Sequence, residues 1–180
     1  MKATGIVRRI DDLGRVVIPK EIRRTMRIRE GDPLEIFTDN DGEVIFKKYS
    51  PIEELSSFSG QFADVLYKSG GYPVIVCDTD QVISVSGVPK KELLERRISP
   101  MLEELMEQRR NYALTKNETK KLQPVEGIDR YALVASPIVV SGDVCGAIMY
   151  LAGDTGGLAS DSEIKLINAG ALFLGKQMEE

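Results

Sequence analysis

The first fifty residues constrain the fold most, because they read as short strands in a segment too small to bury a core alone. Residues 5–10 alternate in hydrophobicity, residues 15–18 are largely β-branched, and residues 34–38 and 43–48 flank a DNDG turn in which Asp-Gly favours a hairpin. A segment of about 50 residues without a disulfide or a metal barely offsets its chain entropy. We therefore expect it to gain its missing apolar contacts from a second copy.

A short helix is expected between these strands, over residues 19–28. Pro19 keeps Ile18 extended and is itself favoured at the first position of a helix. Ile22 and Met26 then share one face of this helix. Three basic side chains project from the rest of it: Arg23, Arg24 and Arg27.

The charge of the chain is unevenly distributed. Residues 1–29 contain nine Lys and Arg against three Asp and Glu, a balance of +6, so the other 151 residues carry −10 and the whole chain −4. Phosphates respond to the local field of a patch rather than to the net charge. The basic segment is thus a candidate surface for double-stranded DNA, and a dimer would double its charge and match the twofold symmetry of the duplex.

Two runs carry a family resemblance: TGIVRRID at residues 4–11 and GRVVIPKEIR at residues 14–23. With the rest of residues 1–50 they resemble the AbrB-type swapped-hairpin DNA-binding domain. The resemblance implies that two chains interlock their strands into one β-barrel and that basic residues contact DNA. It assigns this role first to Arg8, Arg15, Arg23 and Arg24, and more weakly to Lys2 and Arg9. Bacterial antitoxins use a similar N-terminal domain, so an antitoxin-like DNA-binding protein stays a second interpretation.

Two apolar stripes predict helices at the two ends of the remaining chain. The first stripe consists of Ile52, Leu55, Phe58, Phe62 and Val65. The second consists of Ile164, Ile167, Ala171, Leu174 and Met178, and Ser160 with Glu163 forms a capping box before it. The two helices either pack on each other, pair with partner chains and so join two dimers into a tetramer, or cover the sheet of their own domain.

The segment between these helices is expected to hold an antiparallel sheet. Residues 72–80 and 81–87 read as two strands, residues 99–112 as a helix begun by Ser99-Pro100, and residues 131–153 as a strand pair. The run ASPIVVSGDVCGAIMYLAG, with the helix after it, resembles the closing half of a GAF domain. That resemblance implies a small-molecule site or a dimerisation module. The ligand stays unknown; Ser84, Ser86 and Ser136 line either a polar cavity or plain sheet surface.

The composition argues against metal binding and nucleophilic catalysis. It has no His and two Cys, so neither a zinc site nor a Ser-His or Cys-His pair can be built from standard ligands. Some GAF-like proteins reduce methionine sulfoxide with a low-pKa thiolate, but Cys77 lies in an apolar run and Cys145 follows a turn, which favours inert thiols. We expect no catalytic residue, metal or cofactor, and a protein that is not an enzyme.

The two resemblances divide the chain into residues 1–50 for DNA binding and dimerisation, residues 51–70 as a linking or oligomerisation helix, and residues 71–180 as a GAF-like regulatory domain. The expected fold class is α+β throughout. Joined in this order, the two parts resemble transcription regulators of endospore-forming bacteria, which implies an activator and repressor of sporulation genes that forms tetramers. No apolar run reaches the roughly 18 residues of a membrane span, so we expect a cytoplasmic, nucleoid-associated protein.

Overall fold

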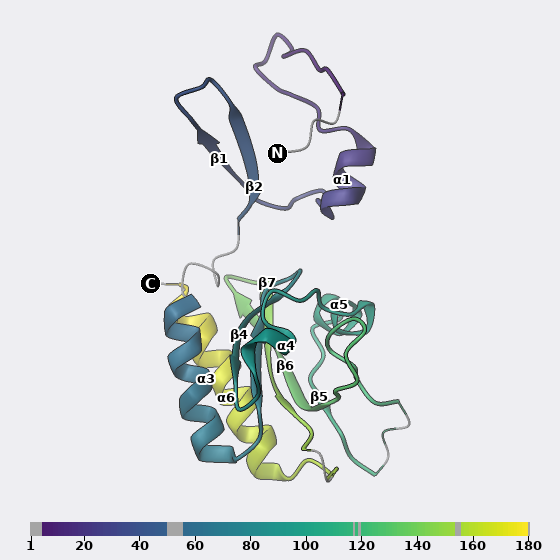
Figure 1. Cartoon of the computed structure of the whole chain (residues 1–180), viewed down its shortest axis with the longest axis vertical. Coiled ribbons are helices and arrows are strands. Elements are labelled where there is room, and N and C mark those ends of the chain that lie inside the picture. The colour runs from purple at the N-terminus through teal and green to yellow at the C-terminus, as the bar shows by residue number, and fades with distance from the viewer. Residues whose placement is uncertain (1–4, 50–55, 117, 119, 154–155, 180) are drawn as a thin grey trace. The chain divides into compact units, whose positions relative to one another are not determined.

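The chain divides into two compact units, unit 1 (Met1–Tyr49) and unit 2 (Ser50–Glu180). The structure, a computed structural model, describes residues 5–49, 56–116, 118, 120–153 and 156–179 (Figure 1). Lys2, Ile52 and Leu55 therefore lie outside the described residues.

Unit 1 contains one short helix and one hairpin. Helix α1 (Lys20–Met26) is followed by the antiparallel strands β1 (Leu34–Thr38) and β2 (Val44–Lys48), paired with Ile36 opposite Phe46. The Asp39 carboxylate accepts the backbone N–H groups of Asp41 at 3.1 Å and Glu43 at 2.8 Å, and Gly42 has a φ of 83°. A short side chain that accepts backbone N–H groups and a glycine with positive φ are typical of a tight hairpin turn. The predicted turn is therefore confirmed.

The other two strands expected in unit 1 do not form within the single chain. Residues 5–10 and 15–18 are joined by a turn and carry no strand assignment. Only the Asp11 N–H to Arg15 carbonyl bond, at 3.0 Å, begins a ladder between them. A strand needs a neighbour to accept its hydrogen bonds, and no third strand of the described part of unit 1 supplies one.

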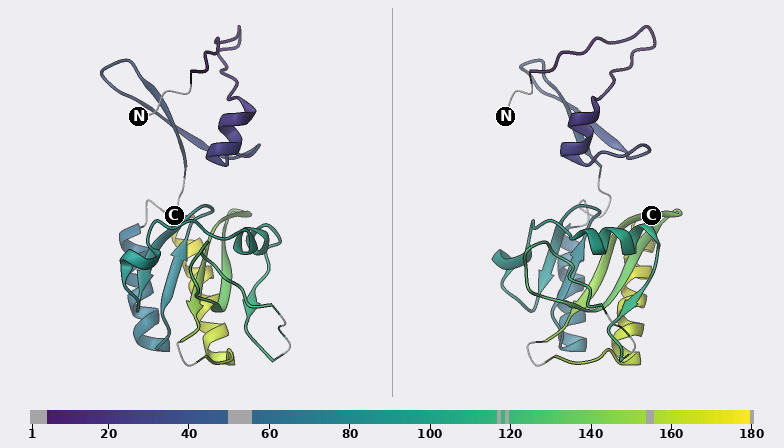
Figure 2. Two further views of the ribbon diagram at one scale, coloured as in Figure 1. Left: turned by 45° about the vertical axis from the view of Figure 1, so that its right-hand side comes forward. Right: turned by 90° about the vertical axis from the view of Figure 1, so that its right-hand side faces the viewer.

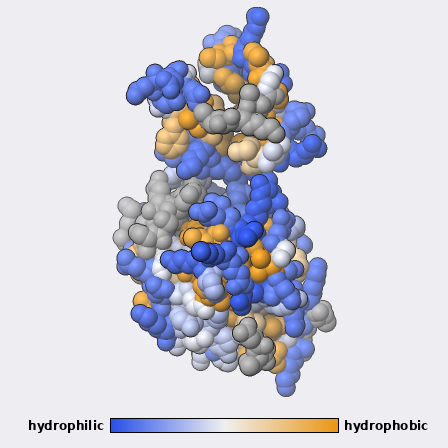
Figure 3. Space-filling view, in the orientation of Figure 1, coloured by the Kyte–Doolittle hydropathy of each residue, from blue (hydrophilic) through white to orange (hydrophobic). Residues whose placement is uncertain are grey.

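Unit 1 has almost no interior of its own. Among its described residues only Pro19 is buried, and Met26, expected beside Ile22 on a packed face, is exposed. Large apolar side chains are open to water, led by Val7 at 89% exposure. The space-filling view shows such hydrophobic residues at the surface among charged ones (Figure 3). Exposed apolar surface of this extent on a compact segment is typical of protein–protein interfaces.

Unit 2 is built on a five-stranded antiparallel sheet with the strand order β4-β3-β7-β6-β5. The strands are β3 (Val74–Cys77), β4 (Val82–Ser86), β5 (Tyr112–Ala113), β6 (Ala132–Val140) and β7 (Asp143–Leu151). The helices are α3 (Ser56–Gly70), α4 (Lys90–Leu93), α5 (Pro100–Glu107) and α6 (Asp161–Gln177). The expected strands, the β6–β7 pair and the antiparallel α+β class are confirmed; α4 and β5 were not expected.

Both faces of the sheet are covered. All four residues of strand β3 are buried, because both faces of the sheet are covered. Val74 and Val76 face α3 and α6, whereas Ile75 and Cys77 face the cluster on the opposite side, which includes α4 and α5. Helices α3 and α6 run side by side along one face (Figures 1 and 2). The interpretation that both end helices cover the sheet of their own domain is thus confirmed for their buried faces.

The apolar stripe predicted for the first helix is only partly confirmed: Phe58 and Phe62 pack against the core, but the fully buried positions lie beside them. In α3 the buried positions are Ser59, Ala63 and Leu66, while Phe58 and Phe62 are half-buried and Val65 is exposed. The aromatic rings also contact Phe173 of α6, with centroids 5.9 Å and 5.2 Å away. In α6 the predicted stripe is correct, because Ile167, Ala171 and Leu174 are buried.

Local capping signals fix the starts of α5 and α6. Ser99, the residue before Pro100, accepts the Leu102 N–H through its side chain and so caps α5. Ser160 and Glu163 form the predicted capping box at the start of α6.

One edge of the sheet is only partly covered. Strand β5 pairs with Val134 and Ala135 of β6 and then ends. The Leu114 N–H donates to the Leu133 carbonyl, so the backbone hydrogen-bonding groups of Leu133 point toward β5. These groups point to alternate sides along a strand, so the backbone of Pro137, four residues later, faces the same side.

Candidate nucleic-acid interface

The basic residues of unit 1 occupy one turn and one helix. Arg8, Arg9 and Arg15 lie on the segment around the first turn, and Arg23 and Arg24 lie on α1; all five are exposed. Arg8, Arg9, Arg23 and Arg24 form no ion pair with any residue that the structure describes. Their charges are therefore available to an external anion.

Arg15 is held in place by Asp11. One Asp11 oxygen accepts the backbone N–H groups of Leu13 and Arg15, at 3.0 Å and 2.7 Å, and the other accepts Arg15 Nε at 2.8 Å. The hydrogen bonds from Arg15 lower the pKa of Asp11, and the bond from the Arg15 backbone N–H has a larger effect than the bond from its side chain. Arg15 Nε is occupied by this bond, but the Arg15 side chain is 69% exposed, so the rest of its guanidinium is accessible to an anion.

Helix α1 ends in a conformation that an arginine seldom adopts. Arg27 has a φ of 51°, and the Arg27 and Ile28 N–H groups return to the carbonyls of Arg24 and Arg23. This is a Schellman ending, in which glycine is the usual left-handed residue. Lys48 Nζ of β2 donates to the Arg27 carbonyl at 3.3 Å and lies 3.6 Å from Asp32, so the hairpin fixes the end of the helix that carries Arg23 and Arg24.

The three serines considered for a polar cavity in unit 2 do not share one. Ser84 Oγ lies 2.7 Å from Ser59 Oγ, and Ser86 donates to Asp64 at 2.6 Å, so both tie β4 to α3. Ser136 donates to Asn111 at 3.0 Å on the same face of the sheet, but beside α6 rather than α3. Buried strand serines that bond a covering helix are structural, because each satisfies a polar group taken out of water.

The cysteines are poor nucleophiles. Burial raises the pKa of the Cys77 thiol, which donates to the Ala147 carbonyl at 3.5 Å. Burial also raises the pKa of the half-buried Cys145, and the Asp143 carboxylate adds to the effect. Across the described ranges no group of three or more His, Cys, Asp or Glu could hold a metal ion. In the same ranges no helix is both long and apolar enough to cross a membrane.

Comparisons with known proteins agree with the division into two units. The family profile described as "Stage V sporulation protein T C-terminal, transcription factor" matches residues 54–179. A second profile, "Antidote-toxin recognition MazE, bacterial antitoxin", matches residues 7–54 only. Residues 54–179 thus belong with a transcription factor rather than with an antitoxin.

Two relatives from Bacillus subtilis (strain 168) cover different shares of the chain. Stage V sporulation protein T is 54% identical over 182 residues, which span all of both chains. Transition state regulatory protein AbrB is 45% identical over 86 residues, 47% of this chain and 88% of its own. Unit 1 is therefore of the AbrB type.

Two solved structures share the fold of unit 2. The GAF domain/HD domain protein from Geobacter sulfurreducens is 18% identical with a TM-score of 0.50, covering 69% of this chain and 91% of its own. A type II free methionine-R-sulfoxide reductase from Thermoplasma acidophilum is 12% identical with a TM-score of 0.52, covering 71% and 94%. At these identities the likeness concerns the fold alone, which is GAF-like.

The full-length match and the family profile, together with an AbrB-type unit 1 and a GAF-like unit 2, show that this chain belongs to the stage V sporulation protein T family of transcription factors.

Proposed function

We propose that this chain regulates sporulation genes, as activator and repressor, by binding double-stranded DNA through unit 1. One observation carries the proposal: exposed arginines without ion pairs to described residues stand on a unit that has almost no core of its own. A DNA-binding surface needs such unneutralised cations, since phosphate contacts supply much of the affinity.

The arginines divide by how firmly they are held. Arg15, oriented by Asp11, and Arg23 and Arg24, on a helix fixed at its C-terminal end, suit defined contacts. A planar guanidinium can pair two acceptors on a phosphate or a guanine edge. Arg8 completes the contacting set, and Arg9 and Lys2 add charge around it.

The DNA-binding form is a dimer in which two copies of unit 1 interlock. The exposed apolar side chains of residues 6–17 and of the hairpin would bury each other, and residues 5–10 and 15–18 would gain strands to pair with. This arrangement is the swapped-hairpin barrel of the AbrB type.

Unit 2 would join two such dimers into a tetramer. Helix α6 exposes Leu172 at 76% and Phe173 at 45%, and α3 exposes Val65 in the same helical layer of unit 2. Two apolar residues in sequence on an exposed helix face favour contact with a second copy. The proposed boundaries are residues 1–50, 51–70 and 71–180, and the chain would act in the cytoplasm on the nucleoid without enzymatic activity.

Fluorescence anisotropy with a labelled DNA duplex tests the proposal. The full chain should bind at low salt, and a variant with Arg8, Arg15, Arg23 and Arg24 changed to Ala should not. Sedimentation of the same variant must show the assembly state of the unchanged chain. Equal binding by the two proteins would refute DNA contact through these arginines.

A further inference from the structure

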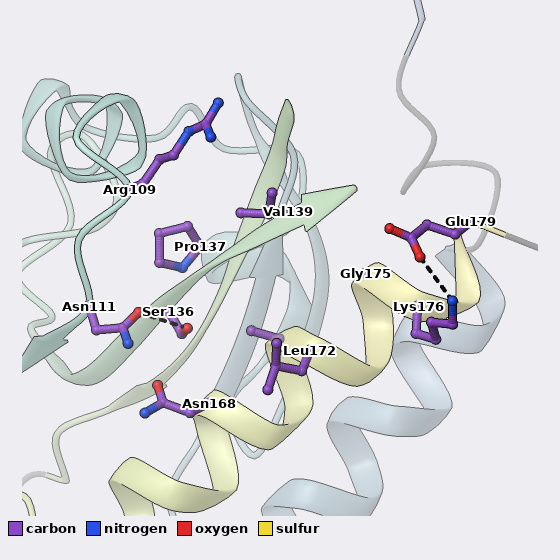
Figure 4. Close-up of a pocket in the computed structure, with 11 residues that line it drawn as sticks. Arg109, Asn111, Ser136, Pro137, Val139, Asn168, Leu172, Gly175, Lys176 and Glu179 are labelled. Atoms are coloured by element: carbon purple, nitrogen blue, oxygen red, sulfur yellow. Dashed lines mark hydrogen bonds and ion pairs between the residues drawn. The ribbon is translucent and has the colours of Figure 1, made fainter. Parts of the chain in front are cut away.

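A hollow of about 500 Å³ lies between helix α6, strand β6 and the segment that follows helix α5. Figure 4 shows Asn111, Ser136 and Asn168 close together in it, with Arg109 and Lys176 at its rim. Its size is within the usual range of small-molecule sites. It is on the α6 side of the sheet and uses neither Ser84 nor Ser86, which bond α3.

The hydrogen bonds of the hollow leave specific groups for a ligand. Ser136 donates to Asn111 Oδ1 at 3.0 Å, so that oxygen is used and Asn111 Nδ2 remains a donor. Lys176 is neutralised by Glu179 at 3.1 Å, and Glu179 also accepts the Ser141 N–H. Arg109 forms no ion pair with any described residue. The hollow therefore offers one unneutralised cation and an amide donor two residues away.

The conformation of Arg109 sets it apart from an ordinary surface arginine. Its φ is 52°, and the Arg109 and Arg110 N–H groups return to the carbonyls of Met106 and Leu105, which is a Schellman ending of α5. Glycine would adopt this left-handed position at lower cost. The backbone conformation at the end of the helix therefore does not require an arginine, and the exposed Arg109 side chain lines the hollow.

Asn168 adds an acceptor that lacks a donor. Its Oδ1 is hidden from water and has no hydrogen-bond partner among the described residues. A buried acceptor without a donor is unfavourable. A ligand that enters beside Asn111 and donates a hydrogen bond to Asn168 Oδ1, drawing the Asn168 amide toward the hollow, would therefore be favoured. Around these polar groups the walls are apolar, formed by Pro137, Val139, Ala171 and Leu172.

We propose that the hollow binds a small carboxylate with an adjacent N–H or O–H donor, an α-amino acid or an α-hydroxy acid. Arg109 and Asn111 Nδ2 would hold the carboxylate, and Asn168 Oδ1 would accept the neighbouring donor. A monoanionic group fits a single unneutralised guanidinium better than a phosphate, which would need more positive charge. The apolar walls would contact the carbon chain of the ligand. This inference is independent of the proposed DNA binding.

Isothermal titration of the full chain without DNA tests the site. The probes are the twenty L-amino acids, their 2-hydroxy analogues and the matching plain carboxylates. We expect at least one amino or hydroxy acid to bind at least about tenfold more tightly than its plain carboxylate, the typical value of a hydrogen bond to a charged group. Which of the two classes binds identifies the donor. No binding by any probe would overturn the proposal.

Three variants separate the site from the fold. Arg109→Gly should raise the Tm of the unliganded protein, because glycine suits the left-handed position, and yet weaken binding at least about tenfold. Arg110→Ala, which changes the neighbouring cation, should bind as the unchanged chain does. Asn168→Leu should keep carboxylate binding but lose the preference for the amino or hydroxy acid. If Arg109→Gly bound as tightly as the unchanged chain, the site would be refuted even if Asn168→Leu failed to fold.

Discussion

At the scale of single residues, Asp11 shows that a negative charge can serve a basic surface. It lies within the basic segment, where by charge alone it should oppose an anion. Its two oxygens, however, hold the turn and the Arg15 guanidinium. Orientation and charge therefore act in opposite directions at this residue, and a substitution shows which is larger.

We predict that Asp11→Ala weakens DNA binding several-fold, although it removes a negative charge from the basic surface. The loss of the Arg15 hydrogen bonds frees the arginine and the turn, which costs more than the charge gains. Asp12→Ala, an exposed neighbour with the same charge change, should bind slightly more tightly. Anisotropy titrations at one salt concentration measure both. Tighter binding by Asp11→Ala would show that charge alone matters there.

We also predict that changing Arg23 and Arg24 together to Ala weakens DNA binding by about 2–4 kcal/mol while Tm stays nearly the same. Both are exposed on α1 and lack ion pairs with described residues, and exposed charges contribute little to folding. The matched control changes Lys90 and Lys91, an exposed basic pair on the short helix α4. A clear fall in Tm of the arginine variant would mark the pair as structural instead.

At the scale of elements, α6 has two apolar surfaces with different roles. Ile167 and Leu174 are fully buried against the sheet, whereas Leu172 is 76% exposed. We predict that Leu172→Asp converts the proposed tetramer into dimers with little change in Tm. Ile167→Asp should instead unfold unit 2, because a buried unpaired charge costs several kcal/mol. Sedimentation and thermal melting distinguish the two, and a tetramer that survives Leu172→Asp would exclude this face from assembly.

The ion pair between Glu92 of α4 and Arg130, which precedes β6, gives a pH test. The hydrogen bond from Arg130 lowers the pKa of Glu92 below its ordinary 4.5. The stabilisation is therefore complete above pH 4.5 and is lost as the pH falls through the lowered pKa. Glu92→Gln should lower the free energy of unfolding at pH 7 by up to about 1 kcal/mol, and this difference from the unchanged chain should disappear once the pH falls below the lowered pKa of Glu92. Glu95→Gln, an exposed neighbour, is the control; equal melting curves for Glu92→Gln and the unchanged chain at pH 7 would contradict the prediction.

The elements that the sequence predicted correctly are those whose causes are local. Ser160 and Glu163 lie three residues apart and cap α6 directly, and Gly42 sets the hairpin turn. Residues 5–10 failed as a strand because a strand depends on a neighbour that the single chain does not supply. In α3 the aromatic residues suggested the buried face, but Ser59 occupies it because Ser84 satisfies its hydroxyl.

Of the polar groups of the α6 hollow, Ser136 was considered for a polar cavity, but Asn111 and Asn168 were missed for another reason. Asn111, Ser136 and Asn168 are more than twenty residues apart in the chain, and none carries a motif. Only the fold of the sheet and α6 brings them together, so no local pattern could have indicated them. The arginines of unit 1, in contrast, are close in sequence and were found from it; their role in DNA binding stays a prediction.

At the scale of the whole molecule, binding should depend steeply on salt. If a dimer of unit 1 neutralises about six phosphates, the slope of log affinity against log salt should be about −5. Anisotropy of the full chain from low to physiological salt measures it. A chain lacking residues 1–49 should show no binding at any salt. A slope near zero would contradict a phosphate-based interface.

The partly covered edge of the sheet has a consequence for crowded solutions. Residues 136–140 of β6 lie opposite the chain that precedes Tyr112, and no strand of the described chain pairs with them on this side; an open edge can recruit a strand from another molecule and so start aggregation. Pro137 faces this side of β6 and has no N–H to donate. An incoming strand would lose a ladder hydrogen bond in the middle of the open stretch. The sheet should therefore resist growth by strand addition at this edge, even at high protein concentration.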